Sequence, residues 1–167
     1  MTDEENEEIR ENAAPGSSKE RALRILGSRN LSAREMEKRL ISKGETAGTA
    51  QQTVKWLEDI GAIDDKEYAT LIVRHYISKG YGLARIRDEL FKRGIDREMW
   101  DEALSDLDGM EDAAYEFVSK KLRGDCGKDD LKRAANTLCA RGFSYEEARA
   151  AVNRYLESIE DTQGGGI

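Results

Sequence analysis

The sequence has little of the chemistry on which most catalytic and metal sites depend. Its 167 residues include one histidine, His75, and two cysteines, Cys126 and Cys139, which are too far apart to form a Cys-x-x-Cys pair. A zinc site or a disulfide framework needs more of these residues at closer spacing. No convergent nucleophile and base stand out either. We therefore expect a protein that is not an enzyme and holds no cofactor and no metal ion.

Long apolar runs are also missing. No segment approaches the run of about 18 apolar residues that marks a candidate membrane helix. Residues 1–11 are acidic, whereas a secretory signal begins with a basic and then an apolar stretch. These two features favour a cytoplasmic protein with no membrane contact.

The formal charge of −7 is concentrated at the two ends of the chain. Residues 1–14 carry −5 and residues 157–167 carry −3, which leaves +1 for the body of the chain. Charged or glycine-rich ends with few bulky apolar residues are typical of disorder, so we expect disordered tails over 1–16 and 159–167. A nearly neutral body with many arginines can still present a basic face to an anionic partner.

Proline is almost absent, since Pro15 is the only one, and apolar residues recur at helical spacing throughout the body. Several helix starts carry the pattern of a short oxygen-bearing residue followed three positions later by Glu or Gln. These pairs are Ser17/Glu20, Ser32/Glu35, Thr49/Gln52, Asp64/Glu67 and Ser144/Glu147. Glycines near the segment ends favour helix termination. The patterns predict an all-α protein with helices over 17–27, 32–43, 49–60, 65–79, 83–93, 96–107, 111–122, 128–141 and 144–158.

A short motif recurs and divides these helices into three groups. The form Leu-x-x-basic-Gly occurs at 40–44, 90–94 and 138–142. We therefore predict three tandem three-helix repeats, over 17–63, 64–109 and 110–158. Units of this size bury little core alone, so stacked neighbours are expected to form an elongated, curved molecule. Within the third copy of the motif we expect Cys139 to lie in the core.

Two segments of the middle repeat resemble the RecX family of bacterial recombination regulators. They are residues 61–69 (GAIDDKEYA) and 79–95 (KGYGLARIRDELFKRGI), and residues 22–26 (ALRIL) and 31–40 (LSAREMEKRL) are similar to the family's N-terminal pattern. The resemblance covers roughly residues 17–157 and is weakest in the third repeat. It implies three tandem three-helix repeats.

The same resemblance implies a function that spacing does not provide. Family members bind the RecA recombinase, especially its nucleoprotein filament, and restrain it. The resemblance therefore implies a regulator that inhibits or modulates the ATPase, recombination and coprotease activities of RecA in DNA repair, and we expect this regulator to be a monomer. Such a protein could also approach single- or double-stranded DNA through a basic stripe.

Basic residues on or beside the middle helices of the first two repeats are the candidate partner contacts. In the second repeat they are Lys79, Arg85, Lys92 and Arg93, with Tyr81 as an aromatic in the preceding turn, and in the first repeat they are Arg39 and Lys43. Such bases can meet acidic groups of the recombinase or DNA phosphates. The structural alternative is a solvated face with Arg85/Glu89 and Asp88/Lys92 ion pairs.

Two further alternatives concern DNA and metal ions. Three-helix units also suit a helix-turn-helix-like DNA-binding protein, although Gln51 and Gln52 are the only base-reading side chains at the start of a third helix. Asp64 and Asp65 are adjacent acids, but a hard cation needs further oxygen ligands that the pattern does not supply. We expect this pair to cap a helix instead.

Overall fold

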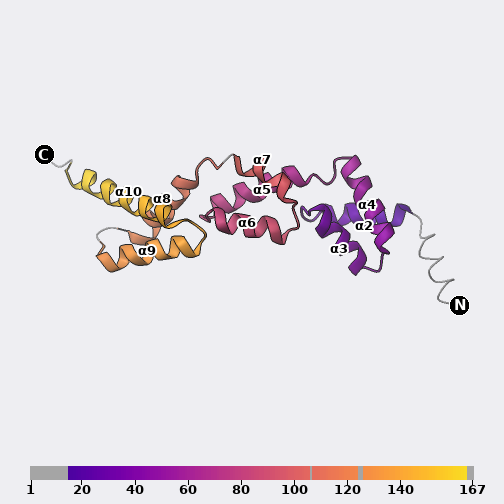
Figure 1. Ribbon diagram of the computed structural model, residues 1–167, viewed down its shortest axis with the longest axis horizontal. Helices are drawn as coiled ribbons and strands as arrows, with labels where there is room; N and C mark the ends of the chain where they lie inside the picture. The colour runs from indigo at the N-terminus through magenta and orange to yellow at the C-terminus, as the bar shows by residue number, and fades with distance from the viewer. Residues whose placement is uncertain (1–14, 106, 124–125, 165–167) are drawn as a thin grey trace. The chain divides into compact units, whose positions relative to one another are not determined.

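The computed structural model describes residues 15–105, 107–123 and 126–164, with side chains from Ser18 onward except that of Gln163. These residues form nine α-helices and one 3-10 helix and no strand (Figure 1), so the all-α prediction is confirmed. None of these helices is both long enough and apolar enough to span a membrane. The helices are α2 (Pro15–Leu26), α3 (Ala33–Ser42), α4 (Ala47–Asp59), α5 (Asp65–Ser78), α6 (Leu83–Lys92), η1 (Arg97–Met99), α7 (Trp100–Ser105), α8 (Met110–Leu122), α9 (Lys128–Ala140) and α10 (Tyr145–Gly164).

Two of the predicted capping pairs are present in full. The Ser32 hydroxyl accepts from the Glu35 amide at 3.1 Å, and the Glu35 carboxylate accepts from the Ser32 amide at 3.0 Å. Ser144 and Glu147 exchange the same two bonds at 3.1 and 2.7 Å. Asp64 accepts from the amides of Lys66 and Glu67, which confirms its capping role at α5. These contacts join residues three positions apart or closer, so local sequence is enough to predict them.

Four element boundaries differ from the prediction. Helix α4 begins at Ala47, since Thr46 rather than Thr49 is the N-cap and accepts from the Thr49 amide. The predicted helix 96–107 is divided into η1 and α7. Helix α10 continues to Gly164, so residues 159–164 are helical and not part of a disordered tail. The helix extends this far because no glycine interrupts it between Ser158 and Gly164. Helix α2 begins at Pro15, because proline is suited to a first helical turn. Other predictions fall outside the described part of the chain, on residues 1–14, 124 and 165–167 and on the side chain of Ser17.

The chain divides into two compact units. Unit 1 comprises the described residues up to Ala69 together with Leu90–Asp101, and unit 2 comprises Thr70–Glu89 together with the described residues from Glu102 onward. All three boundaries between the units, after Ala69, Glu89 and Asp101, fall inside the predicted second repeat. The three repeats and the elongated, curved shape therefore stay predictions.

The core of unit 1 lies among α2, α3 and α4. These helices pack against one another through apolar residues at helical spacing, and Met36, Leu40 and Leu57 are fully buried. The buried cluster is completed by Ala22, Leu31, Ala50, Val54 and Ile63. Since α3 is only ten residues long, its order depends on this packing more than on helix propensity.

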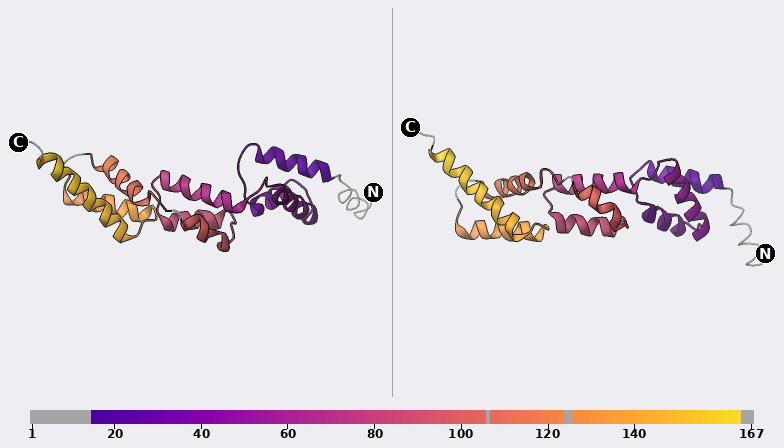
Figure 2. Two further views of the ribbon diagram at one scale, coloured as in Figure 1. Left: turned by 90° about the horizontal axis from the view of Figure 1, so that it is seen from above. Right: turned by 45° about the horizontal axis from the view of Figure 1, so that its top comes forward.

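In unit 2, α8, α9 and α10 pack side by side, as both views of Figure 2 show. Val118, Ala134, Leu138 and Ala148 are fully buried among these helices. The unit also contains most of α5 and α6, where Val73 and Ile86 are buried. This unit therefore has a core of its own, like unit 1.

Candidate protein-interaction surface

The Leu-x-x-basic-Gly motif ends a helix in all three of its copies. Its leucines, Leu40, Leu90 and Leu138, are fully buried. Its glycines, Gly44, Gly94 and Gly142, have φ angles of 96, 70 and 98°, a left-handed conformation in which a side chain is strained. The motif is therefore first of all a structural device that packs the helix and then stops it.

The second position of the motif places an apolar residue in solvent. Phe91 is 66% exposed and Ile41 is 43% exposed. The third copy carries Cys139, which is exposed, so the prediction of a core position for it is wrong. The reason is geometric: the buried leucine one residue earlier occupies the core-facing side, and its neighbour along a helix points about 100° away. The second position of the motif is thus apolar and exposed in all three copies.

In unit 1, the N-terminus of α3 lies against the turn that follows α6. The Ser32 hydroxyl donates a hydrogen bond to the Arg93 carbonyl. A Cβ atom on Gly94 would lie 2.9 Å from the Cβ of Arg34, closer than side chains normally approach. The Ala33 amide donates to the Asp65 carboxylate at 2.9 Å. Besides its local capping box, the N-terminus of α3 therefore finds acceptors in residues far along the chain.

In unit 2, the N-terminus of α6 meets the turn that follows α9 in the same way. The Gly82 amide donates to the Arg141 carbonyl at 3.0 Å, and the Ala84 amide donates to the Gly142 carbonyl at 3.1 Å. A Cβ on Gly142 would lie 2.6 Å from the Arg85 amide nitrogen. The second motif copy thus ends against the start of α3, and the third copy ends against the start of α6. The pattern of the motif itself does not predict either contact.

The basic residue of the motif takes part in these junctions. Arg93 donates to the Tyr68 hydroxyl at 2.6 Å, and burial is the main cause that raises the pKa of Tyr68. Arg141 donates to the carbonyls of Gly80 and Lys79 at 2.8 and 2.7 Å, and its guanidinium lies 4.3 Å from the Tyr81 ring centre. Arg93, a candidate partner contact, is therefore half-buried and engaged within unit 1.

Two other candidate contacts, both partly exposed, are engaged within unit 2. The Arg85 guanidinium pairs with the Glu89 carboxylate at 3.2 Å, so the predicted pair at this spacing is present. Glu89 is buried, which makes this pair part of the packing of α6 rather than a solvated surface pair. Tyr81 is half-buried, with its ring centre 5.5 Å from that of Tyr76. Neither side chain is presented freely to a partner.

The remaining candidates lie on the surface. Arg39, Lys43 and Lys92 are exposed in unit 1, where Lys43 and Lys92 stand within two residues of Ile41 and Phe91. These five residues lie in two groups, Arg39, Ile41 and Lys43 at the end of α3 and Phe91 and Lys92 at the end of α6, and we call the two groups together the apolar-basic surface. In unit 2, Lys79 is exposed and lines a pocket of about 470 Å³ with Phe117 and Lys120. The backbone carbonyl of Lys79 accepts a hydrogen bond from Arg141 at the junction.

The acid pair Asp64–Asp65 acts in helix capping. Asp64 caps α5, and Asp65 accepts from the Ala33 amide at the start of α3. Burial is the first cause that raises the pKa of Asp65, with nearby Asp96, Asp64 and Glu35 adding to it. Among the described residues no group of three or more His, Cys, Asp or Glu side chains is arranged to hold a metal ion.

Comparison with known proteins identifies the family to which this chain belongs. Residues 64–104 match the sequence model described as RecX, second three-helix domain. The chain is 34% identical to the "Regulatory protein RecX" of Xanthomonas axonopodis pv. citri (strain 306), over 83% of this chain and 87% of that protein. It is 32% identical to the protein of the same name from Stenotrophomonas maltophilia (strain R551-3), over 80% and 83%. The chain belongs to the RecX family.

Two solved RecX structures have the same fold. The crystal structure of RecX from Lactobacillus salivarius matches with a TM-score of 0.74 and 22% identity, over 84% of this chain and 95% of that chain. A second, described as regulatory protein RecX, matches with a TM-score of 0.72 and 21% identity, over 89% and 76%. The RecX resemblance of the sequence and its helical fold are thereby confirmed, and the relatives are named as regulatory proteins.

Proposed function

We propose that this RecX-family protein binds the RecA nucleoprotein filament and inhibits its ATPase, recombination and coprotease activities. The observation that carries the proposal is the apolar-basic surface of unit 1. A regulator without catalytic chemistry must act through a binding surface, and this surface combines exposed apolar side chains with positive charge.

The exposed Phe91 favours a protein partner over bare DNA. Aromatic side chains are enriched among the residues that dominate protein interfaces, where they fill pockets on the partner. Phosphate contacts use basic and hydrogen-bonding groups, and sequence readout of a duplex uses side chains that reach base edges. An exposed phenylalanine beside Lys92 adds to neither on duplex DNA, and it suits a protein partner with an apolar pocket and acidic neighbours. Stacking on the bases of single-stranded DNA is the competing use of such a pair.

Inhibition follows if binding differs between states of the filament. A ligand shifts an equilibrium only by its difference in affinity for the two states. Preference for a filament conformation that hydrolyses ATP slowly, or for the ends of the filament, lowers activity without any change in the catalytic groups. The protein would thus act as a regulator and not as a catalyst.

The first test is the ATPase rate of RecA on single-stranded DNA with the purified protein added. We expect the rate to fall at sub-stoichiometric amounts. An unchanged rate at saturating amounts contradicts the proposal. Binding of the protein to DNA alone, with a steep salt dependence and a preference among duplex sequences, would favour the helix-turn-helix alternative.

The second test separates the apolar-basic surface from the rest of unit 1. Phe91→Ser removes the most exposed large apolar group of this surface, and Ile60→Ser is a matched control, since Ile60 is 52% exposed at the end of α4. We expect Phe91→Ser to weaken filament binding by about tenfold, the cost of one moderate interface residue, and Ile60→Ser to leave it unchanged. If both variants change filament affinity equally, the apolar-basic surface is not the binding surface.

The charge of the surface is tested by Lys43→Glu with Lys92→Glu. Both side chains are exposed, so the fold should tolerate the change. Arg85→Glu is a poorer test, because it would place a carboxylate beside the buried Glu89 and disturb α6. We expect the double variant to bind more slowly and with a weaker dependence on salt.

A further inference from the structure

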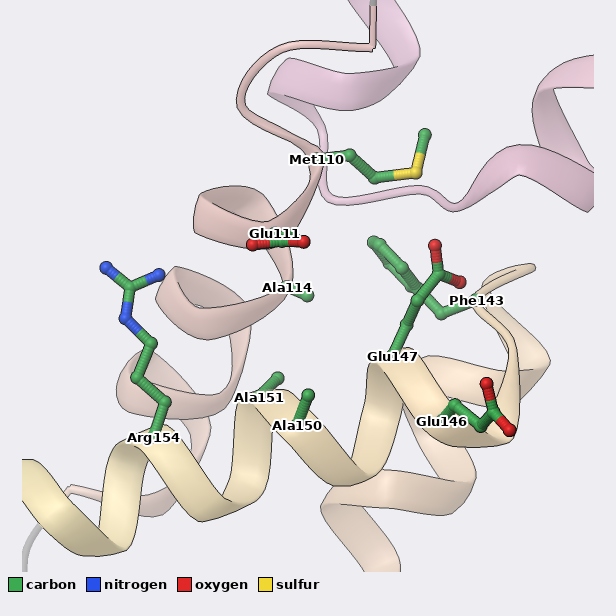
Figure 3. Close-up of a pocket in the computed structure, with 9 residues that line it drawn as sticks. All are labelled: Met110, Glu111, Ala114, Phe143, Glu146, Glu147, Ala150, Ala151 and Arg154. Atoms are coloured by element: carbon green, nitrogen blue, oxygen red, sulfur yellow. The ribbon is translucent and has the colours of Figure 1, made fainter.

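An apolar pocket opens between α8 and α10 of unit 2, and no part of the proposed function uses it. Its volume is about 300 Å³. Figure 3 shows Met110 and Phe143 at one side and Ala114, Ala150 and Ala151 along the two helices. Met110, Ala114, Phe143 and Ala151 are buried, so the floor of the pocket is formed by the core of the unit.

The pocket exists because small side chains face each other across it. Alanines occupy the facing positions of α8 and α10, and Ala150 is itself exposed. Protein interiors are normally packed as densely as organic crystals, so larger residues here would close the gap and gain contacts. An open apolar hollow of this kind is characteristic of a binding site.

The rim of the pocket is acidic. Glu111 comes from α8, and Glu146 and Glu147 come from the start of α10 (Figure 3). The single base at the rim, Arg154, pairs with Asp112 at 2.7 Å, and its guanidinium lies 4.3 Å from the Tyr115 ring centre. Since Asp112 balances the charge of Arg154, the carboxylates leave the rim negative.

The negative rim and the size of the pocket restrict what can enter. Nucleic acid and other anions are repelled by the carboxylates. The volume lies at the lower limit for small-molecule sites, which suits one large side chain better than a cofactor. An apolar side chain with basic neighbours would fill the floor and place its cations among the rim carboxylates.

We propose that the pocket between α8 and α10 receives an apolar anchor residue from a segment of a partner protein in which Lys or Arg flanks that residue. This is the arrangement of a buried anchor with a polar rim that many interfaces use. The site is separate in chemistry from the apolar-basic surface, which is positive. The proposal for this pocket does not depend on whether the protein binds RecA.

The test is an NMR titration of the full chain, with its methionine and alanine methyl groups labelled. The probe is a short peptide with a central leucine flanked by lysines. We expect the Met110 methyl signal and those of Ala114 and Ala150 to shift on addition of peptide. Peptides with serine in place of leucine, or glutamate in place of lysine, should not shift them. No shift at about 1 mM peptide overturns the proposal, since even weak peptide binding is visible at that concentration.

Two variants at exposed positions of α10 give a matched control. Ala150→Leu fills the pocket from its edge, while Asn153→Leu adds a leucine at an exposed position that does not line the pocket. We expect Ala150→Leu to weaken peptide binding at least tenfold and Asn153→Leu to leave it unchanged. Unaltered binding in Ala150→Leu overturns the proposal even if the peptide binds elsewhere on the chain.

Two further readouts separate other occupants and functions. Shifts of the same methyl signals that depend on protein concentration, without peptide, would mean that a second copy of the chain fills the pocket, and would overturn the choice of a partner protein. The RecA ATPase assay with Ala150→Leu separates this proposal from the proposed function. Loss of peptide binding with intact inhibition would leave both in place as independent sites.

Discussion

The junction between α6 and α9 predicts a graded series of stabilities for glycine-to-alanine variants. Gly44 and Gly142 occupy the same motif position with φ angles of 96 and 98°, so alanine carries the same backbone strain at both. That strain is about 1–2 kcal/mol. The two sites differ in their surroundings: a Cβ on Gly44 would meet nothing within 4 Å, whereas one on Gly142 would lie 2.6 Å from the Arg85 amide nitrogen.

The extra cost at Gly142 follows from this contact. The Arg85 amide belongs to the backbone of α6 and cannot rotate away, so the junction must open or distort. Overpacking of this kind costs about 1–3 kcal/mol, which places Gly142→Ala at about 2–5 kcal/mol in total. Gly94→Ala should fall between the two variants. Its Cβ would lie 2.9 Å from the Arg34 Cβ, which is fixed to the α3 backbone, so the junction must shift there too, but by less than at the 2.6 Å contact of Gly142.

The measurement is the free energy of unfolding in urea, followed by circular dichroism at the helix band. We expect the order Gly44→Ala, Gly94→Ala, Gly142→Ala from smallest to largest loss. A Gly142→Ala variant no less stable than Gly44→Ala would refute the close approach of the α9 turn to α6. A far-UV spectrum of each folded variant checks that the helices are retained.

Variants at three other positions, Arg141, Ser32 and Asp65, test further features of the two units by thermal unfolding. Arg141→Ala should lower stability by about 1–3 kcal/mol, since it removes two hydrogen bonds to carbonyls and the stacking on Tyr81; Arg141→Lys should recover little of this, because the planar fork is lost. Ser32→Ala should cost about 1 kcal/mol or more through the lost cap of α3, and an unchanged melting temperature would contradict that role. The pKa of Asp65 is raised above its ordinary value of 3.8 in the folded protein, so its contribution to stability falls as pH rises through that raised value. Asp65→Asn keeps an acceptor for the Ala33 amide, and it should flatten the pH dependence above the ordinary value of 3.8 and leave stability near neutral pH equal or higher.

The helix starts and stops were predictable because they depend on neighbours in sequence. Ser32 and Ser144 form their capping boxes with residues three positions away, and the motif glycines end their helices as expected. The start of α4 was missed because Thr46 and Thr49 are both suitable caps, and the local pattern does not choose between them. The end of α10 was missed because charged and polar residues beyond Ser158 sustain a helix as readily as they form a tail.

The roles of the basic residues were not predictable from the same patterns. Lys43, Arg93 and Arg141 occupy one motif position, yet Lys43 is exposed while the two arginines hold residues elsewhere in the chain. Their partners, Tyr68 and Lys79, are 25 and 62 positions away. Exposure at the second motif position was likewise misjudged for Cys139, since residue type alone suggested burial.

The amino-acid sequence by itself determined that this chain is helical, where most of its helices begin and end, and that it is a RecX-family member. Those properties arise from hydrogen bonds and apolar spacing within a few residues, and from motifs read in order. Tertiary structure alone decided which bases face solvent, which are used at the junctions, and that alanines of α8 and α10 leave an acidic-rimmed pocket between them. These depend on contacts between distant segments, where burial, and not local pattern, sets which groups can meet a partner.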